Sequence, residues 1–180
     1  MNPCGVASAA TIVEAWDKAY NADSVSIYGG IVAFNRPVDK ALAKAIMAKK
    51  VFLEIIMAPG YTDEAKEILS KKTNCRVMLV DMESKFTDKK QALTVNGGLL
   101  YQDLDNEIWN EDELKVVTKK QPTAEEMKDL LFAMKCVKHI KSNAILVAKN
   151  ETTAGVGAGQ MNRVGSAKIA LDWAKEHNIT

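Results

Sequence analysis

Residues 51–61, Val-Phe-Leu-Glu-Ile-Ile-Met-Ala-Pro-Gly-Tyr, combine a nearly continuous apolar run with an abrupt turn. Such a run is typical of a strand that is buried on both faces. The Pro-Gly pair ends the strand. Thr62, followed by Asp63 and Glu64, then supplies the cap and the early acidic residues of a helix. The stretch therefore predicts a strand, a tight turn and a helix in direct succession.

The same alternation continues in both directions from this stretch. Periodic apolar residues predict helices over 12–20 and 38–46, from Thr62, from Thr123 to about Val137 and from about Gln160 to Glu176. Apolar runs predict strands at 25–34, 51–57, 75–81, 98–102, 115–118 and 144–148. The first strand is expected to end or bend at Gly29-Gly30. The less regular stretch 82–120 is interpreted as an insertion or surface excursion. Strands that alternate with helices predict an α/β fold whose sheet is covered on both faces.

The overall composition limits the kinds of partner. A chain of 180 residues without an obvious linker suffices for one well-cored domain, so we expect a single domain over 1–180. Its 24 basic and 23 acidic residues give no positive excess, and no apolar run approaches the roughly 20 residues that span a bilayer. We therefore expect neither nucleic acid nor a membrane as partner. Three widely spaced cysteines are typical of a reducing compartment, which predicts a cytoplasmic location.

A glycine-rich segment, Gly155-Val-Gly-Ala-Gly159, lies between a predicted strand and the last predicted helix. Its spacing is not the dinucleotide-binding fingerprint. Two interpretations stay open: backbone amides that approach an anion at a helix N-terminus, or a tight turn that lets strand and helix pack closely. Arg163, one turn into the helix, favours a phosphate or carboxylate ligand.

Three other positions stand out because of what surrounds them. Gly29, in the pair Gly29-Gly30, weakens an apolar strand and indicates either a β-bulge or a close ligand contact. Glu54 sits within an apolar strand, where a carboxylate needs a ligand, a backbone donor or a cation as partner. Asn143 directly precedes a predicted strand and offers both a donor and an acceptor.

Acid–base and metal chemistry find less support. His139 and Lys141 are the best acid–base pair by residue type, since histidine titrates near neutral pH. Basic residues at the end of a helix, however, also offset its dipole, and this interpretation is favoured. The cysteines have no partner at the spacing of a zinc site, so we expect no metal centre.

Taken together, five segments resemble a known family. They are Asn2-Pro-Cys-Gly-Val6, Ser26-Ile-Tyr-Gly-Gly-Ile-Val-Ala33, Glu54-Ile-Ile-Met-Ala-Pro-Gly60, Val137-Lys-His-Ile-Lys-Ser-Asn-Ala144 and Gly155-Val-Gly-Ala-Gly-Gln-Met-Asn-Arg163. In this order they resemble the transformylase part of the bifunctional purine enzyme AICAR transformylase/IMP cyclohydrolase. The resemblance runs essentially from end to end of the chain.

The resemblance implies a fold and a reaction. The family transfers a formyl group from 10-formyltetrahydrofolate to the 5-amino group of phosphoribosylaminoimidazolecarboxamide (AICAR), and its cyclohydrolase domain closes the ring to IMP. Its transformylase part consists of three-layer α/β/α, cytidine-deaminase-like units without zinc. Its homodimer completes the active sites across the interface, which implies an exposed apolar face here. AICAR contacts would map onto Gly29, Glu54, Asn143 and Arg163, and a folate contact onto Val164. His139 has no catalytic counterpart.

One departure from the family bears on catalysis. The family's catalytic Lys-His pair stands before the Asn-Pro of the first segment, with one variable residue between. Met1 fills that variable position, so the pair would precede this chain. We therefore expect the first deaminase-like unit of the transformylase, without the cyclohydrolase domain and with little or no activity alone. A non-catalytic nucleotide-binding module that retains the AICAR contacts is the alternative. A zinc deaminase would need ligands that this sequence lacks.

Overall fold

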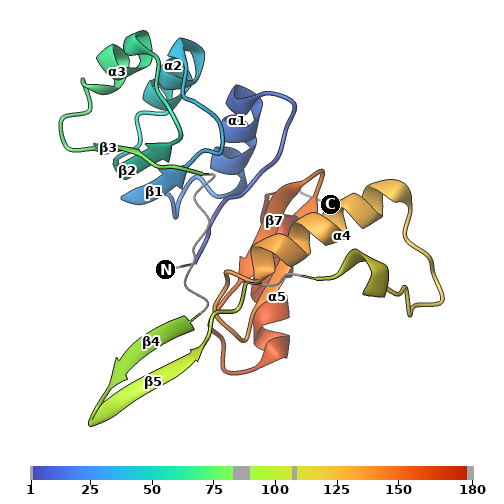
Figure 1. Ribbon diagram of the computed structural model, residues 1–180. Coiled ribbons are helices and arrows are strands. Elements are labelled where there is room, and N and C mark those ends of the chain that lie inside the picture. The colour runs from blue at the N-terminus through green and yellow to red at the C-terminus, as the bar shows by residue number, and fades with distance from the viewer. Residues whose placement is uncertain (1, 83–89, 107–108, 178–180) are drawn as a thin grey trace.

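The computed structural model shows a mixed α/β protein and describes residues 2–82, 90–106 and 109–177 (Figure 1). The helices are α1 (Ile12–Ala22), α2 (Lys40–Ala48), α3 (Asp63–Leu69), α4 (Ala124–Val137) and α5 (Arg163–Glu176), with a short 3-10 helix η1 (Glu111–Glu113). The strands are β1 (Gly30–Ala33), β2 (Leu53–Ala58), β3 (Arg76–Leu79), β4 (Lys90–Val95), β5 (Gly98–Asp103), β6 (Ile145–Lys149) and β7 (Thr152–Gly157). Within the described ranges, no helix is long and apolar enough to cross a membrane.

The first half of the chain forms a parallel sheet in the order β1-β2-β3. The predicted strand, turn and helix around residues 51–61 are confirmed as β2, a turn and α3, with Thr62 accepting a hydrogen bond from the backbone N–H of Ala65. Figure 1 shows α2 and α3 on one side of this sheet. The fully buried side chains between these layers include Val38, Leu42, Ile46, Leu53 and Ile56.

The expectation of one sheet covered on both faces is wrong. Among the described residues, hydrogen bonding divides the strands into three sheets, because β4–β5 and β6–β7 each pair only with each other. On the parallel sheet, Ile31 and Met78 share a face and are each 43% exposed. Both apolar side chains are thus partly open to solvent on that face.

The strand predicted at 25–34 holds only for residues 30–33, and the strand predicted at 115–118 is absent. Residues 24–29 form turns instead of a strand, since Asp23 Oδ1 accepts hydrogen bonds from the backbone N–H groups of Val25 and Ser26 and bends the chain. β1 therefore begins at the glycine pair instead of ending there. Residues 115–118 are irregular, whereas β4 was missed. The Asn-Gly turn between β4 and β5, with Gly97 at φ +79°, is the signal that identifies this hairpin.

The N-terminal segment, residues 2–8, lies along β7. Thr153 joins it twice, since its backbone N–H donates to Val6 O at 2.9 Å and its hydroxyl accepts from Val6 N at 3.0 Å. Ser8 N donates to Glu151 O at 2.9 Å. On its other side the segment packs tightly on α1, where a Cβ on Gly5 would lie 2.0 Å from Ala19 O. The segment thus joins the two halves of the chain.

Helix α5 packs closely against β7 because two glycines face it. A Cβ on Gly155 would lie 1.9 Å from Ala170 O, and one on Gly157 would lie 1.9 Å from Ser166 O. The close-packing interpretation is therefore confirmed for these two glycines. The same helix contacts the end of α1 through Trp173, whose indole N–H donates to Ala22 O at 3.1 Å.

Candidate functional site

Two loops, 141–143 and 159–162, meet at the end of the β6–β7 sheet away from its turn. The backbone N–H of Gly159 donates to Lys141 O at 2.7 Å. Asn143 and Gln160 exchange backbone hydrogen bonds, each N–H lying 3.2 Å from the other residue's carbonyl oxygen. Gly159 has φ +63°, a conformation that glycine adopts at little cost. These bonds fix the position of the residues that follow in each loop.

The side chain of Asn143 strengthens this junction. Its Nδ2 donates to Gln160 O at 3.0 Å and to Met161 O at 3.3 Å. Its backbone oxygen accepts from the hydroxyl of the fully buried Ser166 at 3.1 Å. Its side-chain oxygen has no hydrogen-bond partner among the described residues, which leaves one acceptor for a ligand.

The N-terminal segment reaches the same place. Asn2 Oδ1 accepts a hydrogen bond from the backbone N–H of Lys141 at 2.9 Å. Both residues are exposed. The structure therefore brings together residues from the first, fourth and fifth of the segments that resemble the transformylase, although Asn2 and Gly159 are far apart in the sequence.

Arg163 and Val164 open helix α5 beside this junction. Asn162 caps the helix, since its Oδ1 accepts from Gly165 N at 2.7 Å. Arg163 is exposed, Val164 is 79% exposed, and Met161 in the adjoining loop is 99% exposed. A guanidinium beside two exposed apolar side chains suits a ligand that has both an anionic and an apolar part.

Glu54 lies on β2 of the parallel sheet, and Gly29 is the last turn residue before β1. Gly29 has φ +70° and donates its N–H to Phe52 O at 2.9 Å, and the register of β1 shifts between the next two residues, Gly30 and Ile31, so the glycine pair adjoins an irregularity of the strand. Glu54 Oε2 lies 2.8 Å from Nη1 of Arg76, so a cation is its partner. No hydrogen bond or ion pair within the described ranges joins these two residues to the loops around Asn143.

His139 and Lys141 follow the end of α4, as the interpretation of basic residues at a helix end predicts. The helix ends at Val137, and the exposed His139 donates its backbone N–H to Cys136 O at 3.1 Å. The cysteines are unpaired, and burial raises the thiol pKa of Cys4, Cys75 and Cys136. In the part of the chain that the structure describes, no three histidine, cysteine, aspartate or glutamate side chains lie close enough together to hold a metal ion.

Comparison of the sequence with known families gives one decisive match. Residues 1–173 match the sequence model of the AICARFT/IMPCHase bienzyme family. The chain belongs to this family. Among AICARFT/IMPCHase relatives, the bifunctional purine biosynthesis protein PurH of Bacillus subtilis is 52% identical over 176 residues, which cover 98% of this chain and 34% of the relative. PurH of Gloeothece citriformis is 54% identical over 176 residues, 97% of this chain and 33% of the relative.

The chain thus spans about a third of the length of these AICARFT/IMPCHase relatives. Sequence reasoning identified Asn143 and Arg163 at the loop junction, but it did not single out Asn2 or Gln160. Both lie within the segments that carry the family resemblance, beside residues that were singled out. Their contacts link positions distant in sequence, which periodicity and spacing do not reveal.

Proposed function

We propose that this chain is part of an AICAR formyltransferase, which transfers a formyl group from 10-formyltetrahydrofolate to AICAR in the biosynthesis of IMP. Membership of the AICARFT/IMPCHase family supports this proposal. The observation that carries it is the junction at which Asn2, Asn143 and Gln160 meet beside Arg163. A cytoplasmic homodimer is part of the same proposal.

Each proposed contact has a chemical rationale. Arg163 presents a guanidinium, which binds phosphate oxygens through paired, charge-assisted hydrogen bonds. Asn143 and Glu54 provide acceptors for the amino and hydroxyl groups of AICAR, and Gly29 allows its close approach. The exposed Val164 provides an apolar contact for the folate. To bind the ligand, Glu54 would have to give up part of its ion pair with Arg76 and contact the ligand instead.

We assign residues 1–180 to a single cytidine-deaminase-like unit of the three-layer α/β/α type, without zinc. The parallel order β1-β2-β3 with helices beside it, and the packing of α4 and α5 on β6–β7, support this assignment. Separate hydrogen-bonded sheets in place of one continuous sheet are the feature that the assignment must accommodate.

The chemical step needs more than binding. A base must take a proton from a weakly nucleophilic amine, and a cation must stabilise the charge that develops at the formyl group. The resemblance assigns these roles to a Lys-His pair that would precede Met1, a residue outside the described ranges. We propose that residues 2–177 contribute the binding of AICAR and folate to this step.

Calorimetric titration of the 180-residue chain with AICAR tests the proposal. We expect saturable binding that weakens at least about tenfold in Arg163→Ala, as the loss of a charge-assisted hydrogen bond predicts, and that also weakens in Glu54→Ala. Lys168→Ala removes an exposed positive charge from the same helix and serves as the matched control. Absence of binding, or equal weakening in all three variants, contradicts the assignment of the site.

A further inference from the structure

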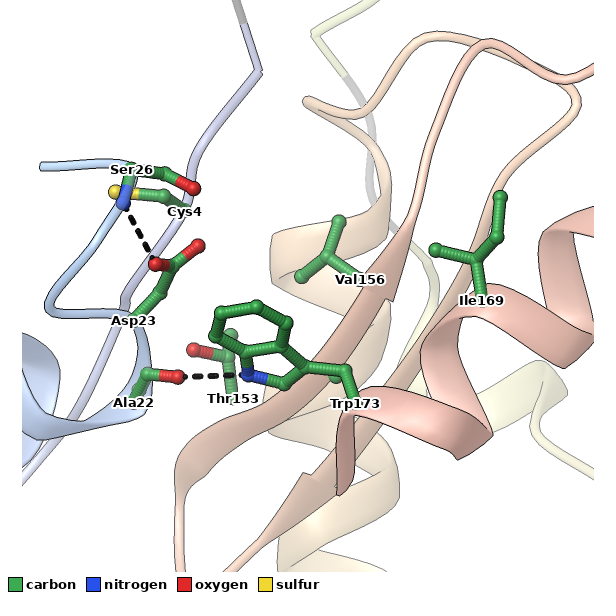
Figure 2. A pocket seen from close by; sticks show the side chains of 9 residues that line it. Cys4, Ala22, Asp23, Ser26, Thr153, Val156, Ile169 and Trp173 are labelled. Carbon is green, nitrogen blue, oxygen red and sulfur yellow. Dashed lines mark hydrogen bonds between the residues drawn. The ribbon is translucent and has the colours of Figure 1, made fainter. Parts of the chain in front are cut away.

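A pocket of about 150 Å³ lies where the N-terminal segment and the end of α1 meet β7 and α5 (Figure 2). Its lining residues are Cys4, Ala22, Asp23, Ser26, Thr153, Gly155, Val156, Ile169 and Trp173. None of the five residues proposed to contact AICAR or folate lines it. The pocket is therefore separate from the site described above.

One side of the pocket is polar, as Figure 2 shows for Cys4, Asp23 and Ser26. Asp23 Oδ1 accepts hydrogen bonds from Val25 N at 3.1 Å and Ser26 N at 2.8 Å, whereas Oδ2 has no partner in the described part of the chain. Burial raises the pKa of the Cys4 thiol, which is therefore neutral at pH 7. Asp23 consequently supplies the only formal charge among the lining residues.

The opposite side is apolar and aromatic. Val156, on β7, and Ile169 and Trp173, on α5, line it (Figure 2). The indole N–H of Trp173 is bound to Ala22 O at 3.1 Å, which fixes the orientation of the ring. The hydroxyl of Thr153 accepts a hydrogen bond from Val6 N at 3.0 Å and so already has a partner within the chain.

Size and charge together define the ligand. An apolar cavity of about 150 Å³ accommodates benzene in another protein. A free carboxylate oxygen attracts a cation and repels phosphates and carboxylates, and an indole ring packs favourably against an apolar group. We propose that this pocket binds a small organic cation, a protonated primary amine that carries an apolar group of about the size of a benzene ring. The ammonium group lies at Asp23 and Ser26, and the apolar group packs against Val156, Ile169 and Trp173.

Such a ligand contacts the end of α1 and helix α5 at once. Its binding therefore stabilises the arrangement in which these segments, distant in sequence, lie together. The thermal midpoint of the chain rises with the concentration of the amine as a result.

Benzylammonium is the probe that tests the proposal, with benzyl alcohol as the uncharged probe of similar size. Binding to the full 180-residue chain is followed through the indole N–H resonance of Trp173 and by calorimetry. We expect saturable binding of benzylammonium and at least about tenfold weaker binding of benzyl alcohol, as the loss of one charged contact predicts. Asp23→Asn keeps a side-chain oxygen for the two turn amides and removes the charge, so it should weaken benzylammonium binding to a similar extent.

Two further variants make the result specific. Asp63→Asn removes the same charge from an exposed position on α3, outside the pocket, and should leave the affinity unchanged. Ile169→Ala shortens a side chain that is 44% exposed, so it should reduce the affinity without preventing folding. The proposal is overturned if binding is not saturable, if Asp23→Asn binds benzylammonium as tightly as the parent chain, or if Asp63→Asn weakens binding equally.

Discussion

Asp129 on α4 holds the turn between β6 and β7 through the backbone of Glu151, whose N–H donates to Asp129 Oδ1 at 2.7 Å. The other carboxylate oxygen accepts from Asn150 N at 2.9 Å. Both turn residues have positive φ, 53° for Asn150 and 50° for Glu151, as a type I′ hairpin turn requires. One carboxylate thus binds two consecutive amides of a turn that carries no glycine. The carbonyl oxygen of Glu151 in the same turn accepts a hydrogen bond from Ser8 N. By fixing this turn, Asp129 also stabilises the position of the N-terminal segment.

Asp129→Ala should lower the free energy of unfolding by about 2 kcal/mol, since hydrogen bonds to a charged acceptor contribute about 1.5–3 kcal/mol. Asp129→Asn keeps one acceptor and should cost less. Urea denaturation gives both values, and amide exchange at Ser8 should accelerate in the alanine variant. A change below about 0.5 kcal/mol for Asp129→Ala, the range of ordinary surface substitutions, would contradict this role.

Gly157→Ala should destabilise the chain by about 1–3 kcal/mol, the usual range for overpacking, because the added methyl group would lie 1.9 Å from Ser166 O. Gly98→Ala is the matched control, since the nearest atom to its Cβ would be 3.9 Å away. Denaturant midpoints of the two variants test the difference. If both change equally, close packing of α5 on β7 is not the reason for glycine at position 157.

Tyr61 should titrate at unusually high pH. Its hydroxyl lies 3.0 Å from Ile56 O and 2.9 Å from Met78 O, between which its single hydrogen is shared, and burial raises its pKa from 10.0 to about 12. A phenol with a raised pKa in the folded state contributes stability that is present below pH 10 and is lost as the pH rises towards 12. Ultraviolet difference titration should therefore show one tyrosine that ionises last. Tyr61→Phe should remove that late step and the stability loss that accompanies it. An unchanged titration curve in the variant would refute the assignment.

The β4–β5 hairpin should tolerate polar substitution. Leu93 and Leu100 pair across its strands and are 50% and 54% exposed. Changing both to threonine keeps the β propensity and should alter the free energy of unfolding by less than about 0.5 kcal/mol per site. Thermal denaturation at low protein concentration measures this effect. A loss above about 2 kcal/mol would mean that the hairpin is buried in solution.

Local signals in the sequence identified most elements correctly. The capping box at Thr123 and Glu126, the cap at Thr62 and the apolar run 51–57 each specify their element through neighbouring residues. The same reasoning was wrong for residues 24–29, whose apolar pattern is typical of a strand. There Asp23 Oδ1 accepts two backbone hydrogen bonds and stabilises turns instead.

The candidate site was harder to predict because it depends on long-range contacts. Arg163 and Asn143 stood out by residue type and position, but the bond from Lys141 N to Asn2 spans 139 positions. Gly155 and Gly157 could be interpreted in two ways from sequence alone, since a helix backbone close to a glycine and a ligand close to a glycine impose the same requirement.

The pairing of Val6 with Thr153 has a consequence for synthesis of the chain on the ribosome. The two residues are separated by 147 positions, so at about 5–20 residues per second Val6 waits about 7–30 s for its partner to be made. During that interval Cys4 and the neighbouring backbone have neither β7 nor α5 to cover them. The segment around Val6 is thus synthesised well before the strand that covers it, and in that interval its thiol and backbone are open to oxidation and to pairing with another chain.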